Sequence, residues 1–438
     1  MGKEINVGLL GFGTVGSGTA RILLEQQKII NARFGGNINL KWICDKDMGS
    51  DRGFPVPEGL LTDDLDMVLN DPDVDIFIEL IGGLEPARTF VLKAIDKGKH
   101  IVTANKALLA THGFEIFRAA SEKGVEVGFE ASVGGGIPCI KAIKEGLAAN
   151  NIQTVMGIMN GTANYILSRM TEEGEGFEEV LKDAQKLGYA EADPTYDIEG
   201  IDTAHKLAIM STLAFGCKVT LDDIFTEGIS GITPVDIAFA GELGYKVKLL
   251  AIGRSSEEGI EVRIHPTMIP ASHLLAQVSG AYNALYMTGD SVGKVMLYGM
   301  GAGQMPTGSA VVADVMDIAR DIAAGAVGRQ HAFGIPFDSI RPAVIRPVAE
   351  LSGKYYCRFN AKDRPGVLSA ISGILSNHGI SIESVVQKKH DFETIVPIVM
   401  LTHEAVEKDI NSALKEIEAL DIISEKPMII RIEELASI

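Results

Sequence analysis

Residues 5–18 read INVGLLGFGTVGSG, and this stretch decides the fold of the first part of the chain. Residues 5–10 are apolar and end at a glycine, which is typical of a buried parallel strand. Gly11, Gly13 and Gly16 follow in the spacing GxGxxG, and a helical pattern continues to about residue 27. Between a first strand and a first helix, this spacing indicates a loop that holds the diphosphate of a dinucleotide at the helix N-terminus. A plain glycine-rich turn is the alternative.

Strand and helix patterns then alternate along the chain. Further strands are predicted at residues 40–44, 74–81, 100–103 and 125–133. This alternation predicts a doubly wound parallel sheet, which binds its ligands at the carboxyl ends of the strands. Asp45 follows the second strand and could accept the ribose 2′-hydroxyl of NAD, whereas Lys46 or Arg52 could hold the 2′-phosphate of NADP. Asp45 could also be a simple turn residue, so the sequence leaves the choice of cofactor open.

Two features at the ends of predicted strands are candidates for function. Asn105 is placed to cap the helix that follows residues 100–103, and Lys106 lies where a positive charge is unfavourable to the helix dipole. That position favours a functional lysine over an ordinary solvated one. Residues 134–136 are three glycines, and with the nearby Glu130 they could surround a cation with oxygen ligands or form a hinge between domains. The residues alone favour the hinge.

Residues 187–206, LGYAEADPTYDIEGIDTAHK, join an acidic loop to an apolar helix. Asp202 and Lys206 are four residues apart and therefore share one helix face. The helix is apolar nearly all round, which predicts burial, and a buried charge needs a partner or a function. Spacing alone favours a structural ion pair at the helix start. The preceding Rossmann pattern, Lys106 and the other glycine loops favour instead a pair that binds substrate and donates a proton.

The second half of the chain predicts a mixed sheet followed by a small domain. Strand patterns at residues 245–253, 260–269 and 282–297 precede a helix from residue 306 to about 324 that should return to the first sheet. Residues 355–432 then read βαββαβ, the ferredoxin-like order. We predict an α/β chain with four parts: a Rossmann nucleotide-binding domain (1–135, completed by the helical segment 306–345), an α+β domain with a mixed sheet (136–305), a linker (346–354) and a ferredoxin-like domain (355–438).

Composition and charge argue against several classes of protein. The formal net charge is −18 and the sequence pI is about 5.0, which disfavours nucleic acid or an anionic membrane as a partner. We find no uninterrupted run of eighteen apolar residues and no signal-peptide pattern, so a cytoplasmic protein is expected. The four cysteines lack metal-binding spacing, which predicts reduced core thiols: Cys44, Cys139, Cys217 and Cys357.

Several stretches together resemble the homoserine dehydrogenase family, in its monofunctional form with a C-terminal ACT domain and without a fused aspartate kinase. They are GLLGFGTVGSG (8–18), TANKALLA (103–110), FEASVGGGIP (129–138), MNGTANYIL (159–167), the acidic segment 187–206 and GAGQMPTGSAVVAD (301–314), with DRPGVL (363–368) for the ACT domain. The motif GYAEADP with a downstream Asp-x-x-x-Lys is highly specific, whereas GxGxxG is not. The match covers nearly the whole chain.

The resemblance implies a reversible NAD(P)H-dependent reduction of L-aspartate 4-semialdehyde to L-homoserine, in the biosynthesis of threonine, methionine and isoleucine. It implies that Lys206 donates the proton, because an ammonium can stabilise the developing alkoxide and then protonate it. It also implies that Lys106 lies between cofactor and substrate. The expected substrate-binding residues are Glu191, Asp202, Asp197 and Gly188. Asp193, Asp197 and Glu199 are alternatives for holding the acidic loop or contacting Lys206.

The resemblance also implies two further ligand sites. The residues expected at the nucleotide, NADP or NAD, are Gly11, Phe12, Gly13, Thr14, Val15, Gly16, Lys106, Gly188 and Gly303. A monovalent cation, with sodium expected, would be held by Glu130, Val133, Gly135 and Ile137, which replaces the hinge as the favoured role of the three glycines. The ACT domain implies feedback by an amino acid, with threonine expected, and the family implies a homodimer or homotetramer. The alternatives are a related reductase of another small amino-aldehyde, or a non-catalytic sensor of dinucleotide and amino acid.

Overall fold

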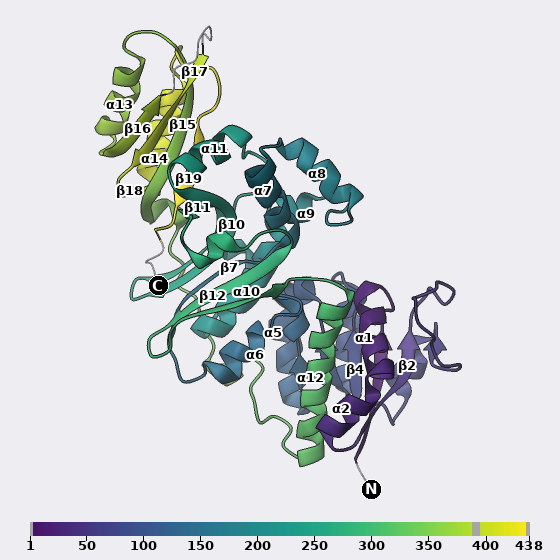
Figure 1. The fold of residues 1–438 in the computed structure, drawn as a ribbon. Helices are drawn as coiled ribbons and strands as arrows, with labels where there is room; N and C mark the ends of the chain where they lie inside the picture. Colours follow the sequence, from purple (N-terminus) through teal and green to yellow (C-terminus); the bar gives the residue numbers. More distant parts are fainter. Residues whose placement is uncertain (1–2, 388–394, 435–438) are drawn as a thin grey trace. The chain divides into compact units, whose positions relative to one another are not determined.

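The structure, a computed structural model, describes residues 3–387 and 395–434. Two compact units emerge from the contacts within the chain (Figure 1). The first comprises Met1–Gly161, Asp202–Ile224 and Tyr282–Ala343, and the second comprises Thr162–Ile201, Phe225–Ala281 and Val344–Ile438. Each unit takes segments from several of the predicted domains, whose boundaries stay predictions.

The first unit contains a six-stranded parallel sheet in the order β3-β2-β1-β4-β5-β6. This order, 3-2-1-4-5-6, is that of the doubly wound dinucleotide-binding fold, which binds its ligand where the strand order reverses, here between β1 and β4. The predicted fold class is therefore confirmed. The strands are β1 (Glu4–Leu10), β2 (Asn37–Cys44), β3 (Leu61–Thr62), β4 (Ile76–Glu79), β5 (His100–Thr103) and β6 (Val127–Gly128). The helices between them are α1 (Thr14–Glu25), α2 (Gln27–Phe34), α3 (Leu65–Asn70), α4 (Ala87–Asp96) and α5 (Lys106–Lys123).

Helix α12 (Gln304–Ala324) returns from late in the chain to the first sheet, as predicted, and it packs beside α1 (Figure 1). A Cβ on Gly308 would lie 2.8 Å from the carbonyl carbon of Gly18, so the two helix backbones are in close contact. The apolar face of α12 shares one core cluster with β1. Gly325, at φ 65°, caps the helix in the left-handed conformation, so the predicted helical segment 306–345 is helical only to Ala324.

The predicted strand at residues 125–133 is wrong in its second half. Strand β6 covers only Val127–Gly128, and Glu130–Ser132 form the 3-10 turn η1. Both carboxylate oxygens of Glu130 accept backbone N–H groups, from Ile140 and Lys141, at 2.8 Å each. Because these donors begin the next helix, the chain turns back toward them and leaves the sheet.

The rest of the first unit carries a small antiparallel sheet and a buried helix. Strands β7 (Ile152–Ile158), β12 (Tyr282–Gly289) and β13 (Gly293–Met300) pair in the order β13-β12-β7. Helix α10 (Ile201–Phe215) is buried at every position from Asp202 to Leu213, which confirms the prediction from its apolar composition. The remaining elements are α6 (Cys139–Lys141), the π-helical η2 (Ala142–Gly146), β8 (Cys217–Lys218), η3 (Leu221–Asp223), η5 (Phe337–Ser339) and β14 (Arg341–Pro342).

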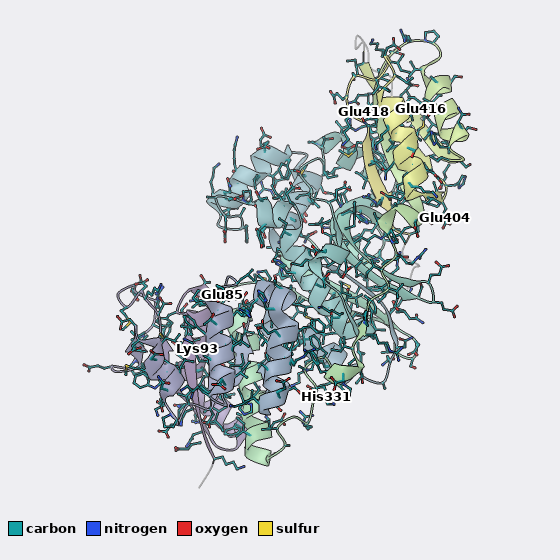
Figure 2. The ribbon with its side chains drawn as sticks, turned by 180° about the vertical axis from the view of Figure 1, so that it is seen from behind. Glu85, Lys93, His331, Glu404, Glu416 and Glu418 are labelled. Atoms are coloured by element: carbon teal, nitrogen blue, oxygen red, sulfur yellow. The ribbon has the colours of Figure 1, made fainter. Side chains whose placement is uncertain are left out.

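The second unit ends in the predicted ferredoxin-like fold. Its sheet order is β19-β15-β17-β16, and α13 and α14 pack against each other (Figure 1). On α14, Ile410 and Ile417 are buried while Glu416 and Glu418 are exposed, as expected of an amphipathic helix (Figure 2). The elements are β15 (Ser352–Lys362), α13 (Val367–Asn377), β16 (Ile382–Gln387), β17 (Ile395–Thr402), β18 (Ala405–Val406), α14 (Glu407–Glu418) and β19 (Met428–Ile432). The predicted strand ends at residues 388 and 393–394 lie outside the described residues.

Earlier parts of the second unit supply further helices and a long hairpin. Strands β10 (Tyr245–Ser256) and β11 (Gly259–Pro270) are antiparallel over their whole length. The helices and short elements are α7 (Gly161–Glu173), α8 (Phe177–Lys186), α9 (Thr195–Ile198), β9 (Phe225–Thr226), α11 (Pro234–Glu242), η4 (Leu274–Gln277) and η6 (Val348–Glu350). Strand β19 pairs with β11 in parallel, so the ferredoxin-like sheet continues into this hairpin.

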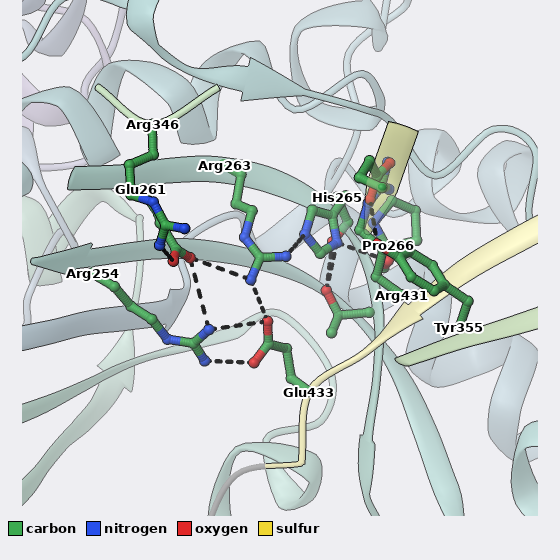
Figure 3. A network of polar contacts seen from close by, with 11 residues as sticks. Arg254, Glu261, Arg263, His265, Pro266, Arg346, Tyr355, Arg431 and Glu433 are labelled. Atoms are coloured by element: carbon green, nitrogen blue, oxygen red, sulfur yellow. Dashed lines mark hydrogen bonds and ion pairs between the residues drawn. The ribbon is translucent and has the colours of Figure 1, made fainter. Parts of the chain in front are cut away.

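A network of charged groups crosses this β11–β19 junction (Figure 3). Glu433, which follows β19, forms ion pairs with Arg254 and with Arg263, the latter at 2.6 Å. Arg431 forms an ion pair with Glu407, which also accepts a 2.9 Å hydrogen bond from the Tyr355 hydroxyl. Removing one partner of a buried ion pair costs about 3–5 kcal/mol. The network therefore attaches the ferredoxin-like fold firmly to the hairpin.

All four cysteine thiols are free and buried. Within residues 3–387 and 395–434, none of the helices combines the length and the hydropathy needed to cross a membrane.

Candidate active site

The glycine-rich loop has the shape that a dinucleotide requires. Gly11 has φ 97°, and a Cβ there would lie 2.6 Å from the carbonyl carbon of Leu80. A Cβ on Gly16 would lie 1.9 Å from the Gly11 carbonyl oxygen, so helix α1 could not approach the loop with any other residue. Gly13 has no atom within 4 Å of its Cβ direction. Two glycines are thus demanded by packing, and the third leaves open the side on which a diphosphate approaches the N-terminus of α1.

Asp45 holds this loop together, which the sequence did not reveal. The Phe12 N–H donates to Oδ2 of Asp45, and the Asp47 N–H donates to Oδ1 at 2.8 Å. The Arg52 guanidinium lies 5.1 Å from the centroid of the Phe12 ring and forms a 2.9 Å ion pair with Asp47. Both oxygens of Asp45 therefore accept hydrogen bonds from the protein, and an arginine lies beside the loop at the end of β2.

The lysines Lys206 and Lys106 meet at one carboxylate. Asp202 accepts a 2.7 Å hydrogen bond from Lys206 Nζ at Oδ2, and its Oδ1 lies 3.2 Å from Lys106 Nζ. Asn160 Nδ2 also donates to Oδ2, at 2.8 Å. Lys206 donates a second hydrogen bond, of 2.6 Å, to the carbonyl oxygen of Met159. Asp202 and Lys206 are buried, whereas the Lys106 side chain is 37% exposed.

The electrostatics keep Asp202 ionised. Burial alone would raise the pKa of its carboxyl. The attraction of Lys206 and Lys106, with hydrogen bonds from Lys206 and Asn160, outweighs burial and lowers that pKa below its usual value. The cluster of two ammonium groups and one carboxylate therefore carries a net positive charge, which suits a site where negative charge develops on a substrate oxygen.

Glu79 is a part of the site that sequence reasoning missed. It ends β4, is 0% exposed and accepts hydrogen bonds from the N–H groups of Ile81 and Gly82 and, at 2.7 Å, from the Thr103 hydroxyl. The Thr103 hydroxyl accepts the N–H of Asn105, and Asn105 caps α5 through the N–H of Leu108. Lys106 follows directly. The available signal was a charged residue at the end of an otherwise apolar strand.

Glu79→Ala is expected to lower kcat about 10²-fold, because the turn that carries Lys106 loses its central hydrogen-bond acceptor. Glu79→Gln keeps one acceptor oxygen and should lie between Glu79→Ala and the wild type. Steady-state kinetics with melting curves measure both effects. Glu85→Ala, which removes an exposed glutamate that precedes α4 (Figure 2), is the control and should keep wild-type kcat. Equal kcat for Glu79→Ala and the wild type would contradict this positioning role.

The predicted cation loop contains oxygen atoms that could be metal ligands, but the Glu130 carboxylate already accepts hydrogen bonds. Both its oxygens accept the N–H groups that begin the next helix. The Val133 carbonyl accepts a hydrogen bond from Cys139 Sγ, and Gly134 and Gly135 have φ of 72° and 55°. A small cavity lies against this loop, with room for about one water-sized particle. The residues that line the cavity are mostly apolar, so the monovalent cation stays a prediction.

The acidic loop belongs to the second unit, together with Glu191, Asp197 and Gly188. Gly188 has φ 77° after α8, and Asp197 lies in α9. Asp193 accepts hydrogen bonds from the Thr195 N–H and hydroxyl, and Glu199 accepts one of 2.8 Å from Ser230. Asp193 and Glu199 therefore hold local structure, while substrate roles for Glu191, Asp197 and Gly188 stay predictions. In the first unit, Gly303 has φ 127° and begins α12.

Three family models match the chain. The model described as homoserine dehydrogenase, NAD binding domain, matches residues 11–130. The model described as homoserine dehydrogenase matches residues 138–316, and the ACT domain model matches residues 355–421.

Curated relatives and solved structures agree with these matches. Homoserine dehydrogenase from Neisseria gonorrhoeae is 48% identical over 433 residues, 99% of each chain, and that from Pseudomonas aeruginosa is 46% identical over 436 residues, 99% of this chain and 100% of the relative. A crystal structure of a homoserine dehydrogenase from Thiobacillus denitrificans superposes with a TM-score of 0.92 at 50% identity, covering 99% of each chain. A hyperthermophilic archaeal homoserine dehydrogenase in complex with NADPH has a TM-score of 0.61 at 25% identity, covering 72% of this chain and 97% of that one.

Proposed function

Since the chain belongs to the homoserine dehydrogenase family and is an NAD(P)-dependent oxidoreductase acting on a CH–OH group, we propose that Lys206 is its proton donor. The reaction is the reversible reduction of L-aspartate 4-semialdehyde to L-homoserine. The nicotinamide supplies the hydride when it is bound. The remaining tasks, which are orientation of the aldehyde, stabilisation of its oxygen and delivery of a proton, fall to side chains of the protein.

One observation carries this role for Lys206. An ammonium has three N–H donors. Two of them are committed, to Asp202 and to the Met159 carbonyl, at 2.7 and 2.6 Å. These two hydrogen bonds fix the direction of the third, which is then the donor for the carbonyl oxygen of the substrate. As negative charge develops on that oxygen, the ammonium stabilises it and then transfers its proton.

The neighbouring residues divide the other tasks. Asp202 balances the charge of both lysines and holds Lys206 in place. Lys106, partly exposed at the carboxyl end of β5, lies between cofactor and substrate in this proposal. The substrate carries an α-ammonium, which a carboxylate such as Glu191 suits. Asp197 and Gly188 stay predicted substrate residues. Thr14, Val15 and Gly303 of the first unit are proposed to contact the nucleotide, and a contact from Gly188 stays a prediction.

The assignment is tested by a steady-state assay. The purified protein should oxidise NADPH or NADH only when aspartate semialdehyde is present, and should reduce NAD(P)⁺ with homoserine. Turnover of another small amino-aldehyde with a higher kcat/KM would favour the related-reductase alternative instead.

We also propose that NADPH is the preferred cofactor. Two observations support this. Both carboxylate oxygens of Asp45 already accept hydrogen bonds from backbone N–H groups, and the Arg52 guanidinium lies against the Phe12 ring near the end of β2. An arginine beside the ribose suits a 2′-phosphate, and Lys46 is close in sequence.

Arg52→Ala is expected to raise KM for NADPH about 10-fold, the loss of one charge-assisted contact to phosphate. KM for NADH should stay within about 2-fold, because NADH lacks that phosphate. Initial rates with each cofactor at saturating semialdehyde measure both values, and NADH serves as the internal control. An equal rise for both cofactors would mean that Arg52 only supports the loop through Asp47.

Regulation and assembly complete the proposal. The ACT domain supports control by an amino acid, for which we propose threonine. We also propose a homodimer or homotetramer as the cytoplasmic assembly. Titrating threonine, isoleucine and methionine into the assay identifies the effector, and light scattering gives the assembly. Unchanged kinetics at saturating concentrations of each amino acid would contradict feedback.

The glycine loop of Glu130, Val133, Gly135 and Ile137 would hold a monovalent cation, sodium being expected.

A further inference from the structure

Arg431 joins two carboxylates that belong to different parts of the second unit. It lies on β19, which pairs with β15 in the sheet of the ferredoxin-like fold. Its Nε and Nη2 donate to Glu407, the first residue of α14 in that fold. Its Nη1 donates to Glu227 at 2.8 Å, and Glu227 directly follows β9, much earlier in the chain. One guanidinium therefore connects the ACT domain to the turn after β9.

Further contacts fix this turn to its surroundings. The Arg431 guanidinium lies 5.0 Å from the centroid of the Phe225 ring, which is on β9. The N–H of Glu227 donates to the carbonyl oxygen of Ile264 on β11, at 2.8 Å. The Arg431 side chain is only 7% exposed, and an ion pair shielded from water is stronger than an exposed one. A displacement of β19 must therefore move the turn after β9 or break this ion pair.

The same turn packs against the end of the acidic loop. The N–H of Ile229 donates to the carbonyl oxygen of Ile198 at 2.8 Å. A Cβ on Gly228 would lie 2.6 Å from that oxygen, so the two backbones are in direct contact. Ile198 ends α9, which carries Asp197, a predicted substrate residue. In the sequence, Asp202 follows Ile198 by only four residues. The turn after β9 therefore supports the segment that leads into the proposed catalytic helix.

We propose that the ion pair between Arg431 and Glu227 transmits effector binding at the ACT domain to the acidic loop. This inference rests on the feedback regulation of the proposed function and names the contact that carries it. An effector that favours one position of β19 or α14 moves Arg431, and the turn after β9 follows. Because α9 packs on that turn, Asp197 moves and the affinity for substrate changes. Arg431 and Glu227 are thus positioning residues, which act through the loop.

The test measures threonine binding to the full chain by calorimetry, with isoleucine and methionine in parallel. Each titration is made with and without homoserine and NADPH, two reduced molecules that cannot react with each other. In the wild type, the two Kd values for threonine should differ on the order of 10-fold, because coupling between two sites is reciprocal. In Glu227→Ala, they should agree within about 2-fold, while threonine alone binds as in the wild type. Threonine inhibition, relative to the uninhibited rate of each variant, should weaken in parallel.

Arg254→Met is the matched control. Arg254 forms its ion pairs with Glu433, beside the same junction of β11 and β19, and with Glu261 (Figure 3). The substitution removes a positive charge from the junction but keeps the contact between Arg431 and Glu227. Wild-type coupling is therefore expected. An equal loss of coupling in Arg254→Met and Glu227→Ala would mean that any weakening of the junction has this effect, and would overturn the specific role of the ion pair.

The outcomes separate the inference from its premise. If none of the three amino acids binds or inhibits the wild type, both the feedback regulation and this inference are overturned. Wild-type coupling in Glu227→Ala would leave the feedback standing and overturn the ion pair as its route. Loss of threonine binding itself in Glu227→Ala would place Glu227 in the effector site and would also overturn it. If Glu227→Ala does not fold, Glu227→Gln decides, because it keeps the size of the side chain and removes only its charge. Reduced coupling in Glu227→Gln supports the inference, and full coupling contradicts it.

Discussion

Lys206→Met is expected to lower kcat about 10³-fold while the protein stays folded, because both oxyanion stabilisation and proton donation are lost. Methionine matches the length of the lysine stem and is apolar, which suits the buried surface of α10. KM for the semialdehyde should change much less than kcat, since the ammonium interacts most strongly with charge that develops during hydride transfer. Initial rates across substrate and NADPH concentrations measure this split, with circular dichroism and melting curves as the test of folding.

A second buried lysine in the same unit supplies the matched control. Lys99 is 4% exposed and donates hydrogen bonds to the carbonyl oxygens of Asp71 and Val74, at 2.7 and 2.9 Å. It precedes β5, whereas Lys106 follows the carboxyl end of that strand. Lys99→Met should therefore lower Tm but keep kcat. If Lys206→Met turns over at the wild-type rate, the proton donor is another group.

The sheet could be predicted because its information is local. Five of the six strands of the parallel sheet contain an apolar run bounded by glycine or a polar residue, and Gly11, Gly13 and Gly16 mark the first turn. The two-residue strand β3 (Leu61–Thr62) has no such run and was not predicted. The strand at residues 125–133 was predicted too long because its end depends on a side chain that reaches ten residues ahead. Glu130 accepts hydrogen bonds from the N–H groups of Ile140 and Lys141, and the pattern of residues 125–133 gives no information about these later residues.

The candidate residues of the active site could be predicted from the sequence, but the contacts between them could not. Spacing on α10 indicates that Asp202 and Lys206 share a face, and the position of Lys106 at a strand end marks it as a candidate. Their meeting at one carboxylate depends on packing between segments about a hundred residues apart. For Asp45 the sequence suggested a role that the structure does not show. An acid at the end of β2 suggests a contact to the ribose of the cofactor, but the carboxylate oxygens of Asp45 accept hydrogen bonds from the N–H groups of Phe12 and Asp47.

Asp202→Asn is expected to lower kcat about 10²-fold and to destabilise the folded protein by about 3 kcal/mol at neutral pH. The side chain keeps its size, but Lys206 and Lys106 lose the negative charge between them and repel each other. The pKa of Asp202 is lowered in the folded protein, so its stabilising contribution is complete above the unfolded value, about 3.9, and declines as the pH falls toward the folded value. The stability difference between wild type and variant should therefore be largest near pH 7 and shrink below about pH 4.

Asp71→Asn separates a catalytic carboxylate from a merely structural one. Asp71 forms a 2.9 Å ion pair with Lys41 and accepts a 2.7 Å hydrogen bond from Trp42. Burial would raise its pKa, but these partners lower it to about 2, so Asp71→Asn should lose stability with the same pH dependence. It should keep kcat, because Asp71 touches neither lysine of the site. If Asp202→Asn also keeps kcat at a temperature where it is folded, Asp202 and Lys206 form only a structural ion pair, as their spacing alone suggests. A loss of kcat in Asp202→Asn and not in Asp71→Asn requires the carboxylate to act on the ammonium groups during the reaction.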